Sequence, residues 1–510
     1  MYNKLYMMNM KNLKYIFASL CVVIGLTSCD LNITPDTDIA GPDAGKLSYV
    51  NGLVAGIYND MAAMQSYENL RIPDYQTDLF NETSESGNRG GFFSRWQLFY
   101  DDQDVYSNWI SYYSIIASVN FTLDKANDAL AAEPENKDAL NVLKGELYFF
   151  RAYFLHQLAL RFCEDYDPAK ADTQLGVPCP TKYDALAKLN RGTLAATYER
   201  ITKDIAEAEK LVLTAGSANS GKITADAITA FKAQVALQMH DYANASTYAK
   251  SLYTKYTLAT SKEDVDDMWK HDSSTETIFQ INLTKSTLVL VGDLTYDYTW
   301  GTWDETESTY IFDPAYVPEQ WVCDLYDSSD WRYGTYLGPN RTKAIAADAA
   351  EQAKVVLKFT GNEDLFTAPN VLTYANMPKI FRVAEMYLID AEAQYRTEGG
   401  DALTPLNALR AARGLAAVSS TGDELFADIK KECVREFIGE GRRLFDLKRW
   451  GDGFKRNGQT AYLTQLKGGA AIYEMEVTAD NPKFVWPIPQ KEGSNNSNIG
   501  AQNPGYTPFN

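Results

Sequence analysis

Four of the nine tryptophans in this 510-residue chain gather between positions 300 and 331, and aspartates are interleaved with them. They are Trp300, Trp303, Trp321 and Trp331, and Tyr296 lies just before them. A flat aromatic ring covers the apolar C–H face of a sugar, while a nearby carboxylate or amide accepts hydrogen bonds from its hydroxyl groups. The segment therefore predicts a surface that binds a polyhydroxylated ligand. The alternative for each tryptophan is a place in the hydrophobic core.

A second candidate patch lies between positions 74 and 100. Its members are Asp74, Asp78, Asn88, Arg89 and Trp96, and the aromatic residues Phe92 and Phe93 belong to the same patch. The glycines at 87, 90 and 91 predict a loop, and binding residues are disproportionately found on loops. We expect the first five of these side chains to contribute to the ligand site as well.

Little in the sequence favours catalysis. The three histidines are widely separated, and no metalloprotease, serine-hydrolase or cysteine–histidine signature is present, so we expect no catalytic residues. In the charged segment 432–451, Glu436, Glu440 and Asp446 alternate with Arg435, Arg442 and Arg443. We expect these charges to pair with one another at helical spacing and to stabilise the fold. A carboxylate pair for glycoside hydrolysis needs only proximity in space, so an anchored hydrolase remains an alternative.

The charge balance is acidic, with 67 Asp and Glu against 48 Lys and Arg and a net charge of −19. Nucleic acid is excluded as a partner because phosphate binding needs a basic face, and strongly anionic glycans are disfavoured for the same reason. No cysteine pair has the spacing of a structural zinc site, so we expect neither a metal nor a cofactor. Cys163 and Cys179 are either bridged or buried as free thiols.

The N-terminus has the features of an export signal. Lys4, Lys11 and Lys14 precede an apolar run, 15–26, that is too short to span a membrane, and small residues then lead to Cys29. This ending resembles the lipobox of bacterial lipoproteins, in which the cysteine is acylated and becomes the first mature residue. We therefore predict a signal peptide over 1–28, lipid attachment at Cys29 and an extended tether over 29–45. No later segment reaches the length of a spanning helix, so the lipid is the predicted membrane contact.

The elements that must position these residues are mainly helical. Apolar residues recur at helical spacing through 46–258, and the segments 224–253 and 383–415 each predict a tetratricopeptide-like helical hairpin. Between them, 259–375 is rich in aromatic residues and loops and contains a predicted strand at 275–283. The tail from 484 to the end is expected to wrap the surface. The predicted fold is thus mainly α, with helical hairpins as a scaffold and a loop-rich, partly β region inserted on the ligand-binding face.

An ordered series of motifs along the chain resembles the SusD/RagB family, the starch-utilisation-type surface lipoproteins of Gram-negative bacteria. After the lipobox, the matching segments are Arg151–Phe154, Thr197–Ile201, Arg382–Leu388, Glu432–Phe437, Glu440–Arg443, Asp446–Gly451 and Trp486–Pro489. A single one of these segments would be a weak signal. Their order over nearly the whole mature chain is specific.

The resemblance implies an outer-membrane, surface-exposed nutrient-binding lipoprotein that is not an enzyme. It implies a lid-like role on a TonB-dependent transporter of the SusC type, with an oligosaccharide as the usual ligand and a peptide in some relatives. It also divides the mature chain into an N-terminal helical region (46–258), a variable ligand-face region (259–375) and a C-terminal region (376–510).

Overall fold

The structure is a computed structural model that describes residues 45–65, 68–87, 89–287, 296–343, 353–467 and 469–509. For residues 68, 69, 296 and 297 it describes the backbone only. The predicted signal peptide, Cys29 and the tether as far as residue 44 lie outside the described residues. From residue 45 onward the chain forms one compact unit.

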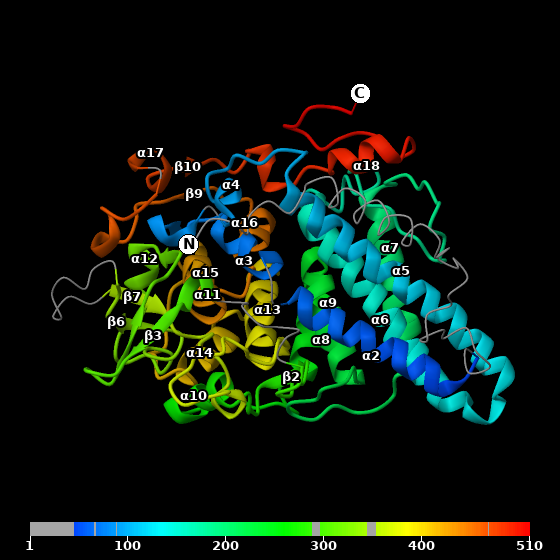
Figure 1. The fold of residues 1–510 in the computed structure, drawn as a ribbon, viewed down its shortest axis with the longest axis horizontal. Coiled ribbons are helices and arrows are strands. Elements are labelled where there is room, and N and C mark those ends of the chain that lie inside the picture. The colour runs from blue at the N-terminus through cyan, green and yellow to red at the C-terminus, as the bar shows by residue number, and fades with distance from the viewer. Residues whose placement is uncertain are drawn as a thin grey trace, which may run out of the picture. The chain divides into compact units, whose positions relative to one another are not determined.

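A series of long helices forms the scaffold (Figure 1). In chain order they are α2 (Leu47–Met64), α5 (Gln103–Ala132), α6 (Lys137–Phe162), α7 (Leu194–Leu211), α8 (Ala225–Gln238) and α9 (Tyr242–Ser251). Each of the helices from α5 to α9 packs against the next in the series, and α2 packs against α5 and α6. Side-chain caps set several helix starts: Asp102 accepts from the backbone at the start of α5, Thr193 at α7 and Thr224 at α8.

The two predicted hairpins are present and pack against each other. In the first, Ala230 and Ala233 of α8 and Ala245 and Ala249 of α9 are fully buried, so small side chains let the helices approach closely. The second consists of α13 (Val383–Arg396) and α14 (Leu403–Ala411). Helix α9 packs on α13, where Tyr253 and Tyr387 stack at 3.9 Å and Ser246 donates to Asp390 at 2.6 Å. The mainly α fold with tetratricopeptide-like hairpins is confirmed.

Short antiparallel pairs of strands make up the partly β region within the described residues. They are β1 (Phe80–Glu82) with β5 (Tyr316–Pro318), β2 (Thr277–Gln280) with β8 (Lys379–Arg382), β3 (Gly301–Asp304) with β4 (Thr309–Phe312), β6 (Leu337–Asn340) with β7 (Ala353–Val356), and β9 (Phe454–Lys455) with β10 (Glu476–Val477). The predicted strand at 275–283 is therefore present as the shorter β2. Because β1 pairs with β5, the ligand-face region is joined directly to the N-terminal region; the three predicted region boundaries remain predictions.

Shorter helices complete the fold. They are α3 (Glu68–Tyr75), α4 (Gly91–Ser94), α10 (Lys262–Lys270), α11 (Tyr296–Thr299), α12 (Gln320–Cys323), α15 (Gly422–Phe437), α16 (Arg443–Trp450), α17 (Ala470–Tyr473) and α18 (Gln490–Asn495). The 3₁₀ turns are η1 (Ser84–Ser86), η2 (Pro134–Asn136), η4 (Glu363–Leu365), η5 (Thr460–Tyr462) and η6 (Pro482–Phe484). Of the helices in the described part of the chain, none has both the length and the apolar character needed to cross a membrane.

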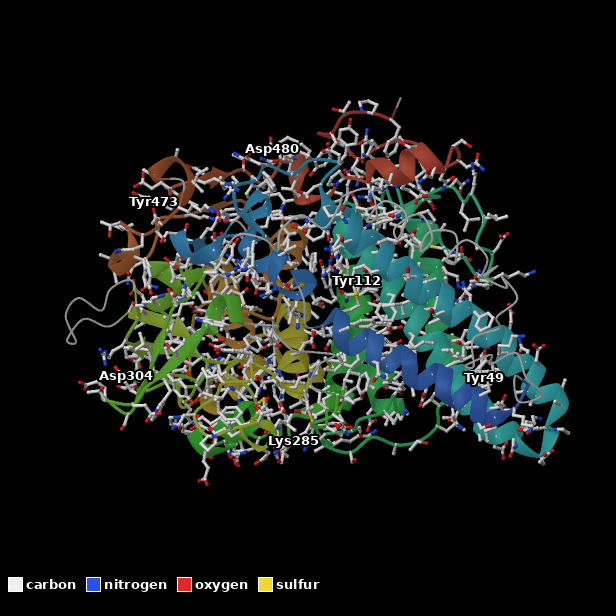
Figure 2. All side chains as sticks on the ribbon, in the orientation of Figure 1. Tyr49, Tyr112, Lys285, Asp304, Tyr473 and Asp480 are labelled. Atoms are coloured by element: carbon white, nitrogen blue, oxygen red, sulfur yellow. The ribbon has the colours of Figure 1, made fainter. Side chains whose placement is uncertain are left out.

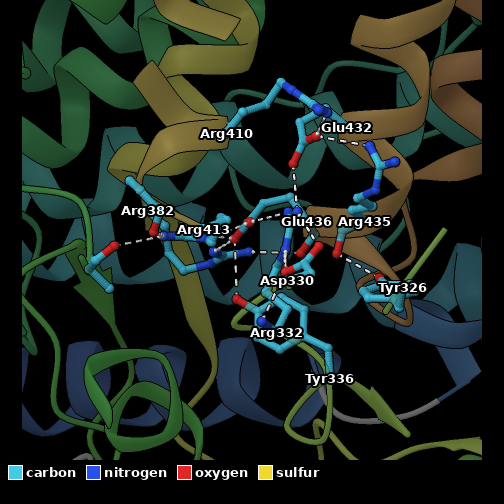
Figure 3. Close-up of polar contacts among 12 residues, drawn as sticks. Tyr326, Asp330, Arg332, Tyr336, Arg382, Arg410, Arg413, Glu432, Arg435 and Glu436 are labelled. Carbon is cyan, nitrogen blue, oxygen red and sulfur yellow. Dashed lines mark hydrogen bonds and ion pairs between the residues drawn. The ribbon is translucent and has the colours of Figure 1, made fainter. Parts of the chain in front are cut away.

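A buried network of charges joins these elements around Glu436 of α15 (Figure 3). The Glu436 carboxylate is fully buried and pairs with Arg382 at 2.5 Å, Arg332 at 3.1 Å and Arg413 at 3.1 Å. Glu276 forms a second ion pair with Arg413, at 2.7 Å. Burial by itself raises the pKa of Glu436, but the three guanidinium groups outweigh it and hold that pKa well below its usual range.

The charges of 432–451 are structural, as predicted, but most of their partners differ from the prediction. Arg435 does pair with Glu432 three residues earlier, at 3.0 Å. Glu436 and Glu440, by contrast, pair with residues far away in sequence. The reason is that α15 ends at Phe437 and the chain turns sharply through Gly439 and Gly441, whose φ angles are +75° and +71°. The charged side chains therefore do not share one helical face.

The C-terminal tail differs in part from the prediction. The tail does not only wrap the surface: Trp486 is fully buried, its backbone N–H donates to Arg161 O at 2.8 Å and its indole N–H donates to Gln76 Oε1 at 2.9 Å. The Trp486 ring anchors the tail because burying a large apolar surface away from water lowers the free energy of the folded chain.

Cys163 and Cys179 are free thiols, so the bridge that the sequence left open is not formed.

We predict that Glu436→Gln lowers the free energy of unfolding by about 3–5 kcal/mol, because it leaves several buried arginines without their shared counter-charge. Urea denaturation followed by circular dichroism measures this. The matched control is Glu424→Gln, the same substitution at an exposed position of α15, which should change the free energy by less than about 0.5 kcal/mol. Equal, small effects of the two substitutions would contradict a central role of the network.

Candidate functional site

The β3–β4 hairpin gathers aromatic side chains on one face. Trp303 pairs with Tyr310 across the hairpin, and Gly301 pairs with Phe312. Since side chains alternate along a strand, Trp303, Tyr310 and Phe312 share a face. The Trp303 and Tyr310 rings meet edge to face at 5.0 Å, and the Phe312 ring lies over Gly301, where an added Cβ would be 3.1 Å away.

Trp300 lies directly before β3 and is exposed to solvent. Its side chain is 41% exposed, and its ring is nearly parallel to that of Tyr374, with 13° between the planes and 6.1 Å between the centroids. The Tyr374 hydroxyl bonds both backbone groups of Gly301, accepting from the N–H at 3.0 Å and donating to the carbonyl at 3.2 Å. Gly301 thus links the two pairs, and we call Trp300, Trp303, Tyr310 and Tyr374 together the aromatic platform.

Asp304, which follows Trp303 in the sequence, does not lie on the aromatic face. Asp304 points to the opposite face of the hairpin, where it accepts from the Thr306 N–H at 2.9 Å and lies 3.5 Å from Arg341. In Figure 2 it lies at the periphery of the molecule. Burial raises the pKa of the Tyr310 hydroxyl, and the charge of Glu363 adds to this rise.

Trp321 and Asp78 are brought together, but by contacts within the protein. The Trp321 indole N–H donates to the carbonyl of Asp78 at 2.9 Å. The Asp78 carboxylate holds the Arg443 guanidinium through two contacts of 2.9 Å, and that guanidinium lies 5.6 Å from the centre of the Trp321 ring. These groups satisfy one another and join the ligand-face region to the start of α16.

Trp96 and Trp331 take part in packing. Trp96 is only 7% exposed, donates its indole N–H to the carbonyl of Gln76 at 2.6 Å, and contacts the rings of Phe454 and Phe484. Trp331 is half-buried against Gly414, where an added Cβ would lie 2.7 Å from its indole nitrogen. Trp96 therefore belongs to the core, whereas Trp331 is partly exposed and its role as a ligand residue stays a prediction.

Asp74 is fully buried and caps a helix from a distance in sequence. Its carboxylate accepts from the backbone N–H of Gly441 at 2.9 Å and of Arg443 at 3.1 Å, at the N-terminus of α16. Burial raises its pKa to about 7, and the hydrogen bonds from these amides offset part of that rise. Asp74 is therefore a fold residue, which the sequence did not reveal because its partners lie more than 360 positions away.

The remaining predicted residues are Arg89, Asn88 and Tyr296. Arg89 is half-buried and its carbonyl accepts from the Tyr316 hydroxyl. Asn88 and the side chain of Tyr296 lie outside the described residues. Sequence reasoning missed Tyr374 and Tyr310 of the platform, and it missed Phe99, which is exposed and meets Phe92 of the second candidate patch edge to face at 6.3 Å. Across the described ranges, no cluster of three or more His, Cys, Asp or Glu side chains is arranged to hold a metal ion.

Two family models match the chain. One, described as the SusD family, matches residues 372–506, and the other, described as "Starch-binding associating with outer membrane", matches residues 33–237. The Starch-binding protein SusD of Bacteroides thetaiotaomicron is 40% identical over 127 residues, which is 25% of this chain and 21% of that protein. A SusD-like protein of Formosa agariphila is 23% identical over 95% of this chain and 100% of its own length.

Solved structures are similar over most of the chain. A putative sugar binding protein from Bacteroides vulgatus superposes with a TM-score of 0.72 at 25% identity, covering 91% of this chain and 99% of its own. A laminarin binding SusD-like protein superposes with a TM-score of 0.68 at 20% identity, covering 90% and 99%, and this likeness concerns the fold alone.

We predict a specific pH dependence of stability for Asp74→Asn. A carboxyl whose pKa is about 7 in the folded chain and about 4 in the unfolded chain contributes stability that is complete below pH 4 and is lost as pH rises to 7. The unfolding free energy of the native protein minus that of Asp74→Asn should therefore fall by up to about 4 kcal/mol between pH 4 and pH 8. Urea titrations at several pH values measure the difference. The exposed Asp480→Asn should give a flat difference, and a flat difference for Asp74→Asn would refute the assignment.

Proposed function

Because the chain belongs to the SusD/RagB family, we propose that it is a cell-surface lipoprotein that binds an oligosaccharide on the aromatic platform. The observation that carries the proposal is the 41% exposed Trp300, nearly parallel to Tyr374, whose hydroxyl bonds Gly301 in the same strand as Trp303 of the Trp303–Tyr310 pair. Each flat ring face offered to solvent suits the C–H face of a sugar ring. A run of such faces suits successive sugars of a chain better than a single small molecule.

The chemistry of the protein favours a neutral glycan. The net charge of −19 disfavours an anionic ligand. Tyr310 supplies a hydroxyl group on the aromatic side, and Arg341 and Lys343 are already engaged by Asp304 and Asp313. Hydroxyl groups of a neutral sugar would meet acceptors there without an unpaired charge. An oligopeptide is the alternative ligand on this scaffold.

Membership of the family also supports a binding role at the outer membrane. Proteins of the family are binding proteins, which confirms the prediction that this chain is not an enzyme. One matched family model describes association with the outer membrane. We infer that the lipid on Cys29 provides this association, that residues 29–44 act as the tether, and that a SusC-like TonB-dependent transporter receives the ligand. Within this arrangement, region 259–375 supplies the platform and regions 46–258 and 376–510 hold it.

We predict that Trp300→Ala weakens binding of a neutral oligosaccharide about tenfold or more, because it removes an exposed stacking face worth about 1.4 kcal/mol or more. Trp303→Ala should have a similar effect. The measurement is calorimetric titration of the soluble chain that begins after Cys29, against panels of neutral and acidic oligosaccharides, with tryptophan fluorescence as a second readout.

The matched control for this substitution is Tyr183→Ala, which removes an aromatic ring that is 50% exposed outside the platform. Its affinity should equal that of the native protein. Binding of a glycan that is indifferent to both Trp300→Ala and Trp303→Ala would exclude the platform as its site. Binding to no glycan, followed by binding to a peptide panel, would favour the peptide alternative.

We predict that Cys29→Ser moves the protein from the membrane fraction to the soluble fraction, because a lipid anchor requires the thiol for acylation. Fractionation of cells and incorporation of labelled palmitate measure this. Cys21→Ser, which changes the other cysteine of the N-terminal segment, should leave both readouts unchanged. Continued membrane retention and labelling of Cys29→Ser would show that the anchor lies elsewhere.

A further inference from the structure

A cavity of about 170 Å³ lies between the helical scaffold and the segment that leads into β8. Its walls come from α6 and α8 on one side, and from α13, residues 374–382 and the α15–α16 turn on the other. Tyr112, one of the lining residues, lies over the middle of the molecule in Figure 2. A single water needs about 10–15 Å³ of such volume, so the cavity has room for a small organic molecule. It adjoins the platform at Tyr374, which contributes to both, but its other lining residues are not platform residues.

Most of the charges around the cavity are balanced in pairs. Arg442 pairs with Glu385 at 2.5 Å, Lys379 with Asp272 at 2.6 Å, and Arg382 with Glu440 at 2.6 Å. Arg449 likewise pairs with Glu392 and Asp446. A charged ligand would have to displace one of these partners and leave it buried and unpaired, which is costly. The electrostatics therefore favour a neutral ligand.

Hydrogen-bonding capacity nevertheless remains open along the walls. Glu385 is 3% exposed and uses Oε1 for both Arg442 and Gln234, while its Oε2 accepts no hydrogen bond from the described residues. Glu440 likewise uses Oε1 for both Lys358 and Arg382. Among the described residues, the Trp269 indole N–H and the Asn376 Oδ1 are buried without a hydrogen-bond partner, and both residues line the cavity. Open acceptors and open donors are thus both present along the walls.

Hydroxyl groups match this pattern, because each one can donate to a carboxylate or an amide oxygen and also accept from an N–H group. Aromatic side chains of the same walls, including Tyr153 and Phe437, offer apolar surface beside these polar atoms. We propose that the cavity is a second, internal binding site for one small neutral polyhydroxylated ring, a monosaccharide or a cyclic polyol. This site does not depend on the platform, and its occupant would bridge α13 to the α15–α16 turn.

Hydrogen–deuterium exchange of the soluble chain, with and without glucose, galactose, mannose, N-acetylglucosamine or myo-inositol, tests the proposal. At least one of these probes should slow exchange, saturably, in residues 376–389 and 437–446, with residues 301–312 unchanged. The same protection should persist in Trp300→Ala. Absence of protection at the cavity with every probe, or protection confined to 301–312, would overturn the internal site. An oligosaccharide effect that Trp300→Ala abolishes would still support the platform in that case, so the two claims fail separately.

Glu440→Gln provides the matched test of the walls, because it keeps the shape and one acceptor oxygen while removing the carboxylate that faces the ligand. Affinity for the protecting probe should fall about tenfold, as expected for a lost hydrogen bond to a charged group. Glu424→Gln, on the exposed surface of α15, should leave the affinity unchanged. Equal affinities of both variants and the native chain would overturn the assignment of Glu440. The exchange map of the native chain decides the main proposal even if Glu440→Gln folds poorly.

Discussion

The buried carboxylate of Glu436 is the interaction on which the relative positions of the loop-rich region and the helical hairpins depend. Three arginines converge on it: Arg332 follows α12, Arg382 ends β8, and Arg413 follows α14. Ions removed from water cost several kcal/mol each, and only a well-formed mutual arrangement offsets that cost. A displacement of any one element would leave a charge unpaired in the interior, so the network fixes the loop-rich region against the helical hairpins and gives the loops a defined geometry without long strands.

The same principle recurs on a smaller scale where loops meet helices. Asp74 caps α16 from α3, and the Asp78–Arg443 pair joins that helix to the Trp321 indole. The platform is built on this fixed frame: Tyr374 precedes β8, whose last residue is one of the converging arginines, and its hydroxyl holds Gly301 at the start of the exposed hairpin. The exposed ring of Trp300 therefore faces a tyrosine that two hydrogen bonds fix to the neighbouring Gly301. A rigid support of this kind lowers the entropy that ligand binding must offset.

The scaffold could be predicted from the sequence because its signals are local. Alanines at helical spacing and turn residues mark α8–α9, and the ordered motifs point to the family. The site could be predicted only in part because burial is decided over long separations. Trp96 and Trp300 look alike in sequence, yet Trp96 is covered by Phe454 and Phe484 while Trp300 stays exposed. Tyr374, which orients Trp300, lies more than seventy positions away, and no pattern connects the two. The charges of 432–451 suggested a local helix network, but positive φ angles at Gly439 and Gly441 redirect them to distant partners.

The central claim is that the exposed aromatic platform, and not the buried tryptophans, contacts the ligand. A crystal structure of the soluble chain with a bound neutral oligosaccharide tests it most directly. The account predicts a sugar ring stacked on Trp300, with the neighbouring ring reaching Trp303 or Tyr310 and with Trp96, Trp321 and Trp331 in their present contacts. An oligosaccharide bound on another surface, for example over Phe92 and Phe99, with the platform left uncovered, would contradict it.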